Sequence, residues 1–247
     1  MRAMILAAGL GLRLRPITEH TPKALVPVAG RPMIEYSLLF LRSGGIRQVV
    51  INVCHLGGQI ENYLGDGARL GLQIEYSREP ELLDTGGAVL KAKPFLAEGP
   101  FIVINCDVMI DLPLAELVAF HARRRPLGTL VLRPDPKAEE YGAIECGDDG
   151  RIYRFLDARA TDTPPGVTRT RMFTGLQIVD PALFSFMEEG EAFSLTRTTY
   201  TRVVRERQPL YGFDYFGFWQ DLGTPAGIAT AEKKLAAGEV ALHYLGS

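Results

Sequence analysis

Short apolar runs alternate with stretches of helical periodicity along the first half of the chain. Uninterrupted apolar runs are typical of buried strands, and apolar residues spaced three or four apart are typical of helices. The runs predict strands at residues 3–8, 49–53, 72–76, 101–107 and 128–133, and the spacing predicts helices at 33–43, 58–64, 88–92 and 114–125. This repeated order of strand and helix predicts an α/β fold with a doubly wound, mostly parallel sheet.

The pattern changes after residue 133. A turn at 148–150 predicts a hairpin over 141–155, and the stretch 160–170, rich in Thr, Pro and Asp, predicts an exposed loop. Further elements are expected at 172–179 (strand), 181–188 and 198–206 (helices), 212–219 (strand) and 226–236 (helix). We therefore expect one domain of 247 residues, with a parallel half over 1–133, a smaller β-rich half over 134–225 and a C-terminal helix within 226–247.

The first apolar run leads directly into a glycine-rich loop that carries basic residues. Gly9 and Gly11 let the backbone bend sharply and bring its N–H groups close to an anion, because no Cβ atom stands in the way. Arg13, Arg15 and Lys23 follow and supply positive charge. The loop therefore predicts a polyphosphate site at the carboxyl end of a strand, and a purely structural turn is the alternative.

Two other phosphate-binding patterns do not fit this loop. A dinucleotide fold of the Gly-x-Gly-x-x-Gly type requires a third glycine, and the residue at that position is Leu14. The Walker pattern requires Gly-Lys-Ser/Thr after the loop, which the sequence lacks. An NAD-dependent oxidoreductase is therefore not expected.

Composition and charge narrow the class of protein. The chain is 47% hydrophobic and 23% charged, its formal net charge is −2, and its longest basic cluster is Arg123-Arg124-Arg125. These values are ordinary for a globular protein and do not favour nucleic acid as a partner. The apolar runs are too short to cross a membrane, and the three cysteines, Cys54, Cys106 and Cys146, have no metal-ligand spacing. We expect a cytoplasmic protein with reduced thiols and neither a nucleic-acid nor a membrane partner.

Three acidic positions are candidates for chemistry. Asp107 closes the most apolar run, and ligands of open α/β sheets bind beyond the carboxyl ends of strands. Asp84 precedes Thr85-Gly86-Gly87 and is expected to be the N-cap of a helix whose free N–H groups could hold an anion; an ordinary cap is the alternative. Asp221 precedes the last helix and either belongs to a site or caps that helix.

Taken together, the motifs resemble those of the sugar-1-phosphate nucleotidyltransferases. The resemblance rests on Leu6-Ala7-Ala8-Gly9-x-Gly11-x-Arg13-x-Arg15-Pro16-x-Thr18, Pro22-Lys23, Gly30-x-Pro32-Met33-Ile34, Asp84-Thr85-Gly86-Gly87-Ala88, Asp107, Tyr141-Gly142, Phe173-Thr174-Gly175 and Trp219-x-Asp221-x-Gly223-Thr224-Pro225. These motifs span residues 1–225 in the order typical of the family. Residues 1–112 most resemble the N-acetylmuramate-1-phosphate uridylyltransferases, and the second half is more similar to the mannose-1-phosphate guanylyltransferase-like branch.

The resemblance implies a Rossmann-like nucleotidyltransferase fold and a reaction of the EC 2.7.7 type, in which an NTP and a sugar 1-phosphate give an NDP-sugar and pyrophosphate. It implies that Asp107 and Asp221 bind Mg²⁺ and that Arg13 and Lys23 are catalytic, whereas Arg15 is expected to be a structural ion-pair partner. The implied nucleotide contacts are Leu6, Ala8, Gly9, Gly11, Asp84, Thr85, Gly86, Gly87 and Asn105. The implied sugar contacts are Tyr141, Gly142, Asp157, Thr174 and Gly175.

Four departures from the family pattern bear on these expectations. Leu12 stands where Ser or Thr is usual, Ala24 where Pro is usual, and Cys106 where a small residue usually precedes the metal-binding aspartate. Asp157-Ala158-Arg159 stands in place of Glu-Lys-Pro, so it is open whether Arg159 replaces the lysine that holds the sugar phosphate.

The substrates are open at this stage. UTP with N-acetylmuramate 1-phosphate, which would give a cell wall precursor, is preferred, and GTP with mannose 1-phosphate or a related hexose 1-phosphate is the alternative. A non-catalytic nucleotide-sugar-binding regulator is a second alternative, because of Leu12 and the missing Glu-Lys-Pro. Since little chain follows the last helix, we expect a single activity without an added acyltransferase or β-helix domain. The oligomeric state is open, and a homo-oligomer is one of the alternatives.

Overall fold

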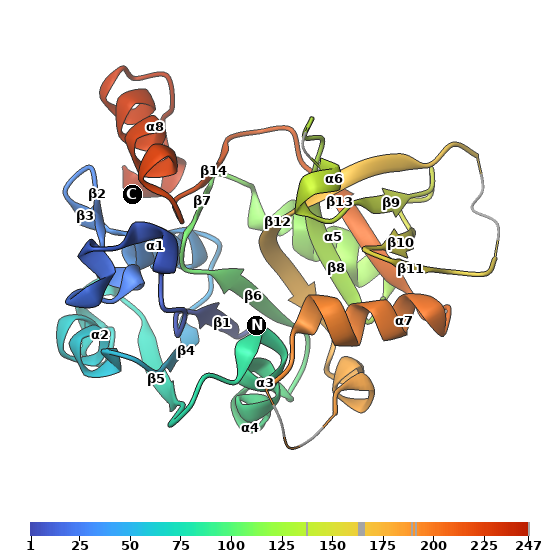
Figure 1. Ribbon diagram of the computed structural model, residues 1–247, viewed down its shortest axis with the longest axis horizontal. Helices are drawn as coiled ribbons and strands as arrows, with labels where there is room; N and C mark the ends of the chain where they lie inside the picture. The colour runs from blue at the N-terminus through green and yellow to red at the C-terminus, as the bar shows by residue number, and fades with distance from the viewer. Residues whose placement is uncertain (137, 163–165, 189, 191, 247) are drawn as a thin grey trace. The chain divides into compact units, whose positions relative to one another are not determined.

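The computed structural model describes residues 1–136, 138–162, 166–188, 190 and 192–246, and Figure 1 shows its helices and strands. The chain divides into two compact units. The first unit comprises Met1–Leu82, Ile104–Leu114 and Gly217–Ser247, and the second comprises Leu83–Val103 and Ala115–Phe216. Each unit is therefore assembled from segments that are separated in the sequence. The division into a nucleotide half and a sugar half concerns function and stays a prediction.

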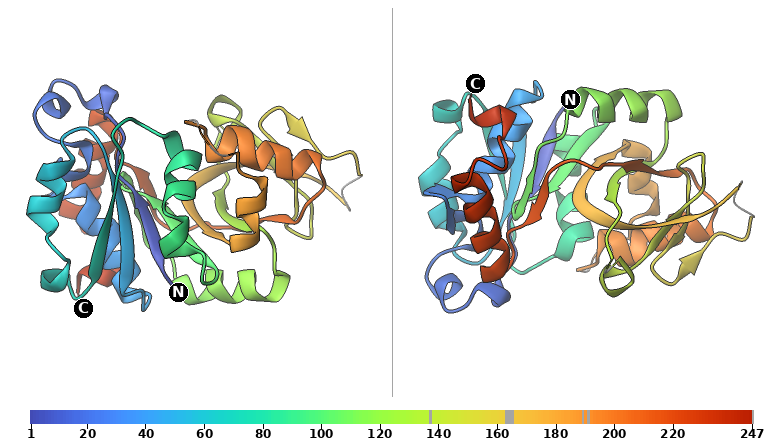
Figure 2. Two further views of the ribbon diagram at one scale, coloured as in Figure 1. Left: turned by 90° about the horizontal axis from the view of Figure 1, so that it is seen from below. Right: turned by 90° about the horizontal axis from the view of Figure 1, so that it is seen from above.

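Parallel strands form the centre of the first unit. They are β1 (Ala3–Leu6), β4 (Gln48–Val53) and β5 (Gln73–Arg78), with β4 paired to both of the others. The helices α1 (Met33–Ser43) and α2 (Gly57–Leu64) cover one face of these strands, as Figure 2 shows. α1 begins directly after Pro32 and ends at Gly44, as the sequence predicts, and nearly all of its apolar side chains are buried.

Shorter elements complete the first unit. β2 (Pro27–Val28) pairs with β3 (Arg31–Pro32), and β7 (Val108–Ile110) pairs with β14 (Trp219–Asp221), both in antiparallel fashion. The last helix, α8 (Pro225–Ala236), follows β14 directly. Single-turn 3₁₀ helices occur at Leu12–Leu14, Ile17–Glu19, Lys23–Leu25, Ala68–Leu70 and His243–Leu245.

The second unit is built mainly from antiparallel strands. In pairing order these are β11 (Ala158–Arg159), β10 (Ile152–Phe155), β9 (Ile144–Cys146), β12 (Arg169–Val179) and β8 (Gly128–Arg133), with β13 (Leu210–Asp214) parallel to β8. Its helices are α3 (Asp84–Lys91), α4 (Lys93–Leu96), α5 (Leu114–Arg124), α6 (Ala138–Tyr141) and α7 (Thr201–Arg205). β6 (Phe101–Asn105) spans the boundary between the units along the chain.

Most predicted elements are present, and a few differ in type or in bounds. The predicted strand 212–219 is two strands, because β13 pairs with β8 whereas β14 pairs with β7. The segment predicted as a helix over 198–206 begins as a π-helix at Leu195–Tyr200 and becomes α-helical at Thr201–Arg205. The segment 181–188 forms a 3₁₀ helix over Pro181–Phe186. The predicted loop 160–170 includes residues 163–165, which lie outside the described part of the chain.

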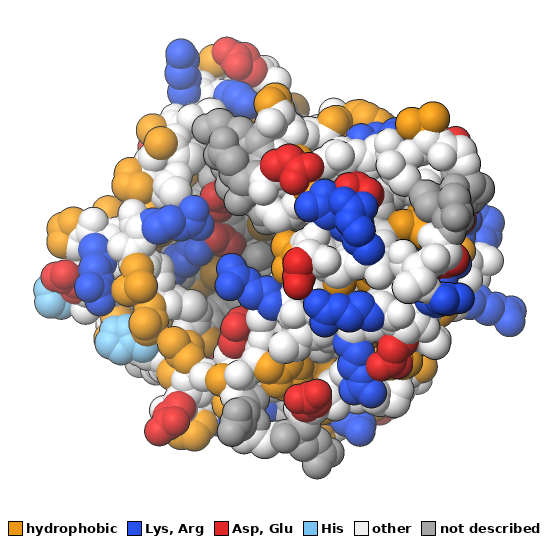
Figure 3. Space-filling model, turned by 45° about the vertical axis from the view of Figure 1, so that its right-hand side comes forward, with side chains coloured by type: hydrophobic (Ala, Val, Ile, Leu, Met, Phe, Trp, Pro, Cys, Tyr) orange, Lys and Arg blue, Asp and Glu red, His pale blue; other side chains and the backbone are white. Residues whose placement is uncertain are grey.

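The surface carries charges of both signs. On the face drawn in Figure 3, many Lys and Arg side chains stand beside Asp and Glu side chains, in keeping with the formal net charge of −2. Among the described residues, no helix is both long enough and apolar enough to cross a membrane.

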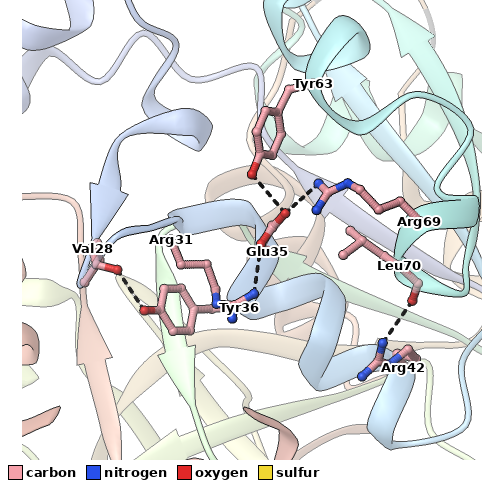
Figure 4. A network of polar contacts seen from close by, with 8 residues as sticks. All are labelled: Val28, Arg31, Glu35, Tyr36, Arg42, Tyr63, Arg69 and Leu70. Atoms are coloured by element: carbon pink, nitrogen blue, oxygen red, sulfur yellow. Dashed lines mark hydrogen bonds and ion pairs between the residues drawn. The ribbon is translucent and has the colours of Figure 1, made fainter. Parts of the chain in front are cut away.

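A buried carboxylate ties α1 to its neighbours in the first unit (Figure 4). Glu35 accepts hydrogen bonds from Arg69 at 2.7 Å and Tyr63 at 3.0 Å, and its second oxygen pairs with Arg31 at 2.9 Å. Burial by itself raises the pKa of the Glu35 carboxyl. The hydrogen bonds from Arg69 and Tyr63 and the charges of Arg69 and Arg31 lower the pKa by more than burial raises it, so the pKa lies below its usual value. Glu35 is therefore ionised at neutral pH and holds three side chains on one carboxylate.

We predict that Glu35→Ala lowers the free energy of unfolding by about 1–3 kcal/mol at pH 7, because it removes charge-assisted hydrogen bonds. The pKa of Glu35 is lower in the folded state than in the unfolded chain, so this stability is present above the usual carboxyl pKa and is lost as the pH falls through the folded value. Urea denaturation at a series of pH values should show the difference from wild type shrinking below about pH 4.5. Glu75→Ala, at an exposed position on β5, is the control. A difference between Glu35→Ala and wild type that is the same at every pH would contradict the lowered pKa of Glu35.

Candidate functional site

The glycine loop after β1 is held in one conformation by its neighbours. Gly11 has a φ of +63°, and a Cβ atom there would lie 2.9 Å from a Thr18 methyl carbon and 3.0 Å from the Lys23 Cβ atom. The Thr18 hydroxyl donates a hydrogen bond of 2.9 Å to the Gly11 carbonyl. In contrast, a Cβ atom on Gly9 would have no neighbour within 4 Å. Gly11 is therefore required for the fold of the loop, whereas Gly9 leaves open space beside its backbone.

Backbone pairing brings Asp107 and Asp221 together in the first unit. β7 begins one residue after Asp107 and pairs with β14, so that Asp221 lies opposite Val108. The Leu222 N–H donates a hydrogen bond of 2.8 Å to the Asp107 carbonyl. The two carboxylates, which are far apart in the sequence, are thus fixed on neighbouring strands.

Two cations lie against these carboxylates. The Lys23 ammonium donates a hydrogen bond to Asp107 Oδ2, and only 14% and 13% of these two side chains is exposed. The more exposed Arg13 guanidinium lies 3.6 Å from Asp221 Oδ2. The four residues form what we call the charge cluster.

Gly223 leaves room inside the charge cluster. A Cβ atom at this position would lie 2.5 Å from an Arg13 guanidinium nitrogen, 2.8 Å from Asp107 Oδ2 and 2.9 Å from Asp221 Oδ1. Oxygens of both carboxylates and one guanidinium nitrogen therefore surround a point that the missing side chain would fill. Any residue other than glycine would force this arrangement apart.

The charges of the cluster determine the protonation of Lys23. Burial by itself lowers the pKa of the ammonium group, but the negative charge of Asp107 and its hydrogen bond, with a smaller contribution from Asp221, more than offset this, so the pKa is raised. Lys23 is therefore fully charged at neutral pH. Burial raises the pKa of the neighbouring Cys106 thiol to about 12, so that side chain is neutral at the same pH.

Two alternatives for single residues are resolved by these contacts. The N-cap of α8 is Thr224, whose hydroxyl oxygen accepts a hydrogen bond of 3.0 Å from the Gly227 N–H. Asp221 Oδ1 instead accepts from the Gly223 N–H at 2.9 Å, so Asp221 does not cap the helix. Within the described part of the chain, Arg15 makes no ion pair, contrary to its expected structural role, and its side chain is exposed.

The donor set of the cluster suits a hard divalent cation such as Mg²⁺. Asp107 and Asp221 offer carboxylate oxygens, which Mg²⁺ prefers, and Gly223 leaves space beside them. The described residues contain no group of three or more His, Cys, Asp or Glu that could hold a metal. A cation bound here would therefore take its other ligands from water and from bound phosphates, as Mg²⁺ commonly does.

The start of α3 in the second unit differs from the sequence prediction. Asp84 is the first residue of the helix, with a φ of +54°, and is not its N-cap. The Gly86 and Gly87 N–H groups donate to the Phe193 carbonyl at 2.8 and 3.3 Å, so these donors are not free to bind an anion. A Cβ atom on Gly86 would lie 2.2 Å from the Phe193 ring. Gly86 is therefore required for the close approach of Phe193, and the Thr85 hydroxyl oxygen accepts from the Leu195 N–H at 2.9 Å.

The predicted sugar-binding residues also belong to the second unit. Gly142 and Gly175 have φ values of +95° and +87°, which favour glycine. The Thr174 side chain is buried, and its hydroxyl donates to the Val131 carbonyl at 2.8 Å. Asp157 is exposed in the turn between β10 and β11 and accepts a hydrogen bond of 3.2 Å from Arg205. The side chain of Tyr141 lies outside the part of the chain that the structure describes.

Arg159, the candidate replacement for the lysine that holds the sugar phosphate in the family pattern, has partners of its own. Its guanidinium pairs with Glu145 at 3.0 Å, and Glu145 also pairs with Arg154 at 2.8 Å. Burial by itself raises the pKa of the Glu145 carboxyl, but its hydrogen bonds from the two arginines lower it, so the pKa lies below its usual value. Arg159 thus serves a local ion-pair network in this structure.

The structure therefore brings together Arg13, Lys23, Asp107 and Asp221 in the first unit, beside the loop that holds Gly11. Leu6, Ala8, Gly9 and Asn105 belong to the same unit, whereas the segment 84–87 and the predicted sugar contacts belong to the second. The packing of Phe193 on Gly86 could not be predicted from the sequence, because it has no local signal. Asn52 was not predicted as a functional residue either, although it stands out as the one polar residue in the apolar run 49–53.

Comparisons with known proteins show the family to which the chain belongs. The family model described as "Nucleotidyl transferase" matches residues 2–238. The chain is 35% identical to the N-acetylmuramate alpha-1-phosphate uridylyltransferase of Neisseria meningitidis over 94% of its length and 97% of the relative's. It is 34% identical to the mannose-1-phosphate guanylyltransferase catalytic subunit beta of Drosophila pseudoobscura pseudoobscura, over 93% of its own length. The chain spans about three fifths of the length of the guanylyltransferase relatives it matches.

A solved structure shows the fold. A Bacillus anthracis protein, provisionally assigned as a glucose-1-phosphate thymidylyltransferase, superimposes with a TM-score of 0.80 at 22% identity. The match covers 98% of this chain and 96% of the solved one. The predicted α/β fold, with a mixed, mostly parallel sheet and flanking helices, is confirmed.

We predict that Lys23→Met lowers the free energy of unfolding by about 1–3 kcal/mol, because it leaves the nearly buried Asp107 carboxylate without its cation. The double variant Lys23→Met/Asp107→Asn should recover most of this loss, because no charge is then left unpaired. Urea denaturation at pH 7 measures both. Arg78→Met, which breaks the exposed pair with Glu61, is the control and should change stability little. Additive losses in the double variant would contradict the coupling of Lys23 to Asp107.

Proposed function

Because the chain belongs to the nucleotidyl transferase family, we propose that it transfers a nucleotidyl group from an NTP to a sugar 1-phosphate and releases pyrophosphate. The observation that carries the proposal is the charge cluster, in which two carboxylates and two cations lie beside a loop with open space at Gly9. Such an arrangement suits a reaction between two phosphate groups, because both reactants are anions and must be brought together against their mutual repulsion.

In the proposed reaction, an oxygen of the sugar 1-phosphate attacks the α-phosphorus of the NTP. The bond from the α-phosphorus to the oxygen bridging it to the β-phosphate breaks, and pyrophosphate leaves with the electron pair. No protein nucleophile is needed, so the residues act by positioning the reactants and by balancing charge. We assign Lys23 to the α-phosphate and Arg13 to the departing pyrophosphate, while backbone N–H groups of the Gly9–Gly11 loop hold the outer phosphates.

Asp107 and Asp221 are the proposed ligands of Mg²⁺. When bound, the ion would neutralise negative charge on the phosphates and help to align them. In this structure Lys23 and Arg13 balance the same two carboxylates. Each cation can therefore exchange a carboxylate partner for a phosphate oxygen, and neither carboxylate is left without compensation when the substrates and the metal bind.

The remaining contacts complete the proposed site. Leu6, Ala8 and Asn105 are proposed to contact the nucleotide from the first unit, and Asp84, Thr85, Gly86 and Gly87 from the second. In the segment 84–87, the Gly86 and Gly87 N–H groups and the Thr85 hydroxyl already have hydrogen-bond partners in Phe193 and Leu195. The nucleotide would therefore contact other atoms of this segment. Tyr141, Gly142, Asp157, Thr174 and Gly175 are proposed to lie on the sugar side. Asp157 could contact a polar substrate directly, because its carboxylate is exposed.

UTP with N-acetylmuramate 1-phosphate is the preferred pair of substrates. The resemblance of residues 1–112 to the N-acetylmuramate-1-phosphate uridylyltransferases and the 35% identity to the Neisseria uridylyltransferase support this pair. The product would then be a cell wall precursor, made in the cytoplasm. GTP with mannose 1-phosphate is the alternative, which the similarity to the guanylyltransferases supports.

A screen of five NTPs against three sugar 1-phosphates, read by pyrophosphate release, tests the proposal. The sugar 1-phosphates are those of N-acetylmuramate, mannose and glucose, and we expect the highest rate with UTP and N-acetylmuramate 1-phosphate. Activity should disappear in excess chelator and return when Mg²⁺ is added. Full activity in chelator would contradict the metal site, and binding of nucleotide-sugar without turnover of any pair would favour a regulator.

We predict that Arg13→Ala and Lys23→Ala each lower turnover by roughly 10²–10³-fold, the scale for losing one preorganised charge donor. The control is Arg15→Ala, which removes an exposed cation two residues from Arg13 and should leave turnover unchanged. Pyrophosphate release under saturating substrates measures all three. If Arg15→Ala were as slow as Arg13→Ala, general attraction by positive charge rather than a specific contact would explain the effect.

A further inference from the structure

A buried polar residue stands at the end of β4, where the strand is otherwise apolar. Only 4% of Asn52 is exposed, and burying a carboxamide is costly unless its polar atoms have partners. Asn52 Oδ1 accepts a hydrogen bond of 2.8 Å from the Ala7 N–H. Asn52 Nδ2 donates one of 2.9 Å to Glu79 Oε1. The side chain thus links the carboxyl ends of β1 and β5.

Glu79 determines which way the Asn52 amide points. Its side chain is 5% exposed, and its backbone N–H donates to the Val53 carbonyl at 2.8 Å, so it has little freedom to move. A carboxylate can only accept hydrogen bonds, so the NH₂ group of Asn52 must face it. Oδ1 must then face the Ala7 N–H. The reversed amide would place an oxygen against the carboxylate and an NH₂ group against the N–H.

Ala7 is the point at which the chain leaves β1 for the glycine loop. The residue before it, Leu6, lies opposite Asn52 in the parallel pairing and accepts a hydrogen bond of 3.1 Å from the Cys106 N–H. The backbone is therefore fixed from both sides just before Gly9. A glycine-containing segment loses much conformational entropy when it becomes ordered, so fixing its origin in advance lowers the cost of binding a ligand.

We propose that Asn52 and Glu79 are positioning residues that set the direction of the glycine loop for the triphosphate of the nucleotide. The inference rests on the proposed function, because it assigns this loop to the NTP. Asn52 acts through the Ala7 N–H, and Glu79 acts through Asn52. Neither residue needs to touch the substrate.

Asn52→Ala tests the first step. It should raise the KM for the NTP by about tenfold, the effect of losing one hydrogen bond worth about 1.4 kcal/mol, while the KM for the sugar 1-phosphate stays the same. Amide hydrogen exchange should become faster at residues 7–11 in the protein without substrates. The matched control is Tyr200→Phe, which removes a buried hydrogen bond to Gln177 in the second unit. It should lower stability and leave both KM values and the exchange of residues 7–11 unchanged.

Two variants at Glu79 test the second step. Glu79→Gln keeps an oxygen that can accept from Asn52, and its KM for the NTP should stay within twofold of wild type. Glu79→Ala removes the acceptor and should raise that KM, by less than Asn52→Ala does. If Asn52→Ala does not fold, the contrast between Glu79→Gln and Glu79→Ala decides the matter alone.

The outcomes separate this inference from the proposed function. A wild-type protein that turns over none of the NTPs defeats the proposed function, and the exchange of residues 7–11 still tests the link from Asn52 to the loop. An active wild type with the same NTP KM and the same exchange in Asn52→Ala overturns the inference. A rise in both KM values to the same degree would also overturn it, since it would indicate a general structural defect.

Discussion

The short antiparallel pairing of β7 with β14 is the constraint on which the charge cluster depends. It places Asp221 opposite Val108, one residue from Asp107, although the two aspartates come from distant parts of the sequence. Without that pairing, the two carboxylates would have no fixed position relative to each other. The mutual repulsion of two carboxylates opposes their approach, and the cations of Lys23 and Arg13 compensate for it. Backbone hydrogen bonds and opposite charges thus hold together a site that repulsion alone would separate.

The two ion pairs of the cluster differ in how firmly they are held. Lys23 and Asp107 are nearly buried, and the charge of Asp107 raises the pKa of the lysine, so this pair is the more firmly held of the two. Arg13 is more exposed and lies farther from Asp221, so water screens the interaction and the side chain can reorient at little cost. In the proposed reaction, the firm pair would hold the α-phosphate end of the site and the loose pair would follow the leaving pyrophosphate.

Much of the fold could be predicted from the sequence because it depends on local patterns. The apolar runs give β1, β4 and β8 nearly at their observed bounds, and Pro32 and Gly44 delimit α1. The split of the predicted strand 212–219 could not be predicted, because it depends on which distant strand each part pairs with. Likewise, the hydrogen bonds of the Gly86 and Gly87 N–H groups to the Phe193 carbonyl could not be predicted, because Phe193 lies more than a hundred residues away.

For the candidate site, too, some features could be predicted from the sequence and others could not. The resemblance of their sequence motifs to those of a known family identified Asp107, Asp221, Lys23 and Arg13 as candidates. It could not show that Thr224 rather than Asp221 caps α8, or that Gly223 leaves space between the carboxylates, because both facts depend on distances between side chains. The role suggested for Asn52 likewise needs the positions of Ala7 and Glu79 on either side of it.

The division of the first unit into three chain segments has a consequence for protein synthesis. The chain leaves this unit after Leu82, returns for Ile104–Leu114, and returns again only at Gly217. A nascent chain therefore emerges from the ribosome with Lys23 and Asp107 long before Asp221 is made. The second unit, by contrast, is complete before the last segment appears, and domains generally fold as they emerge. The charge cluster can therefore close only after β14 has emerged and paired with β7.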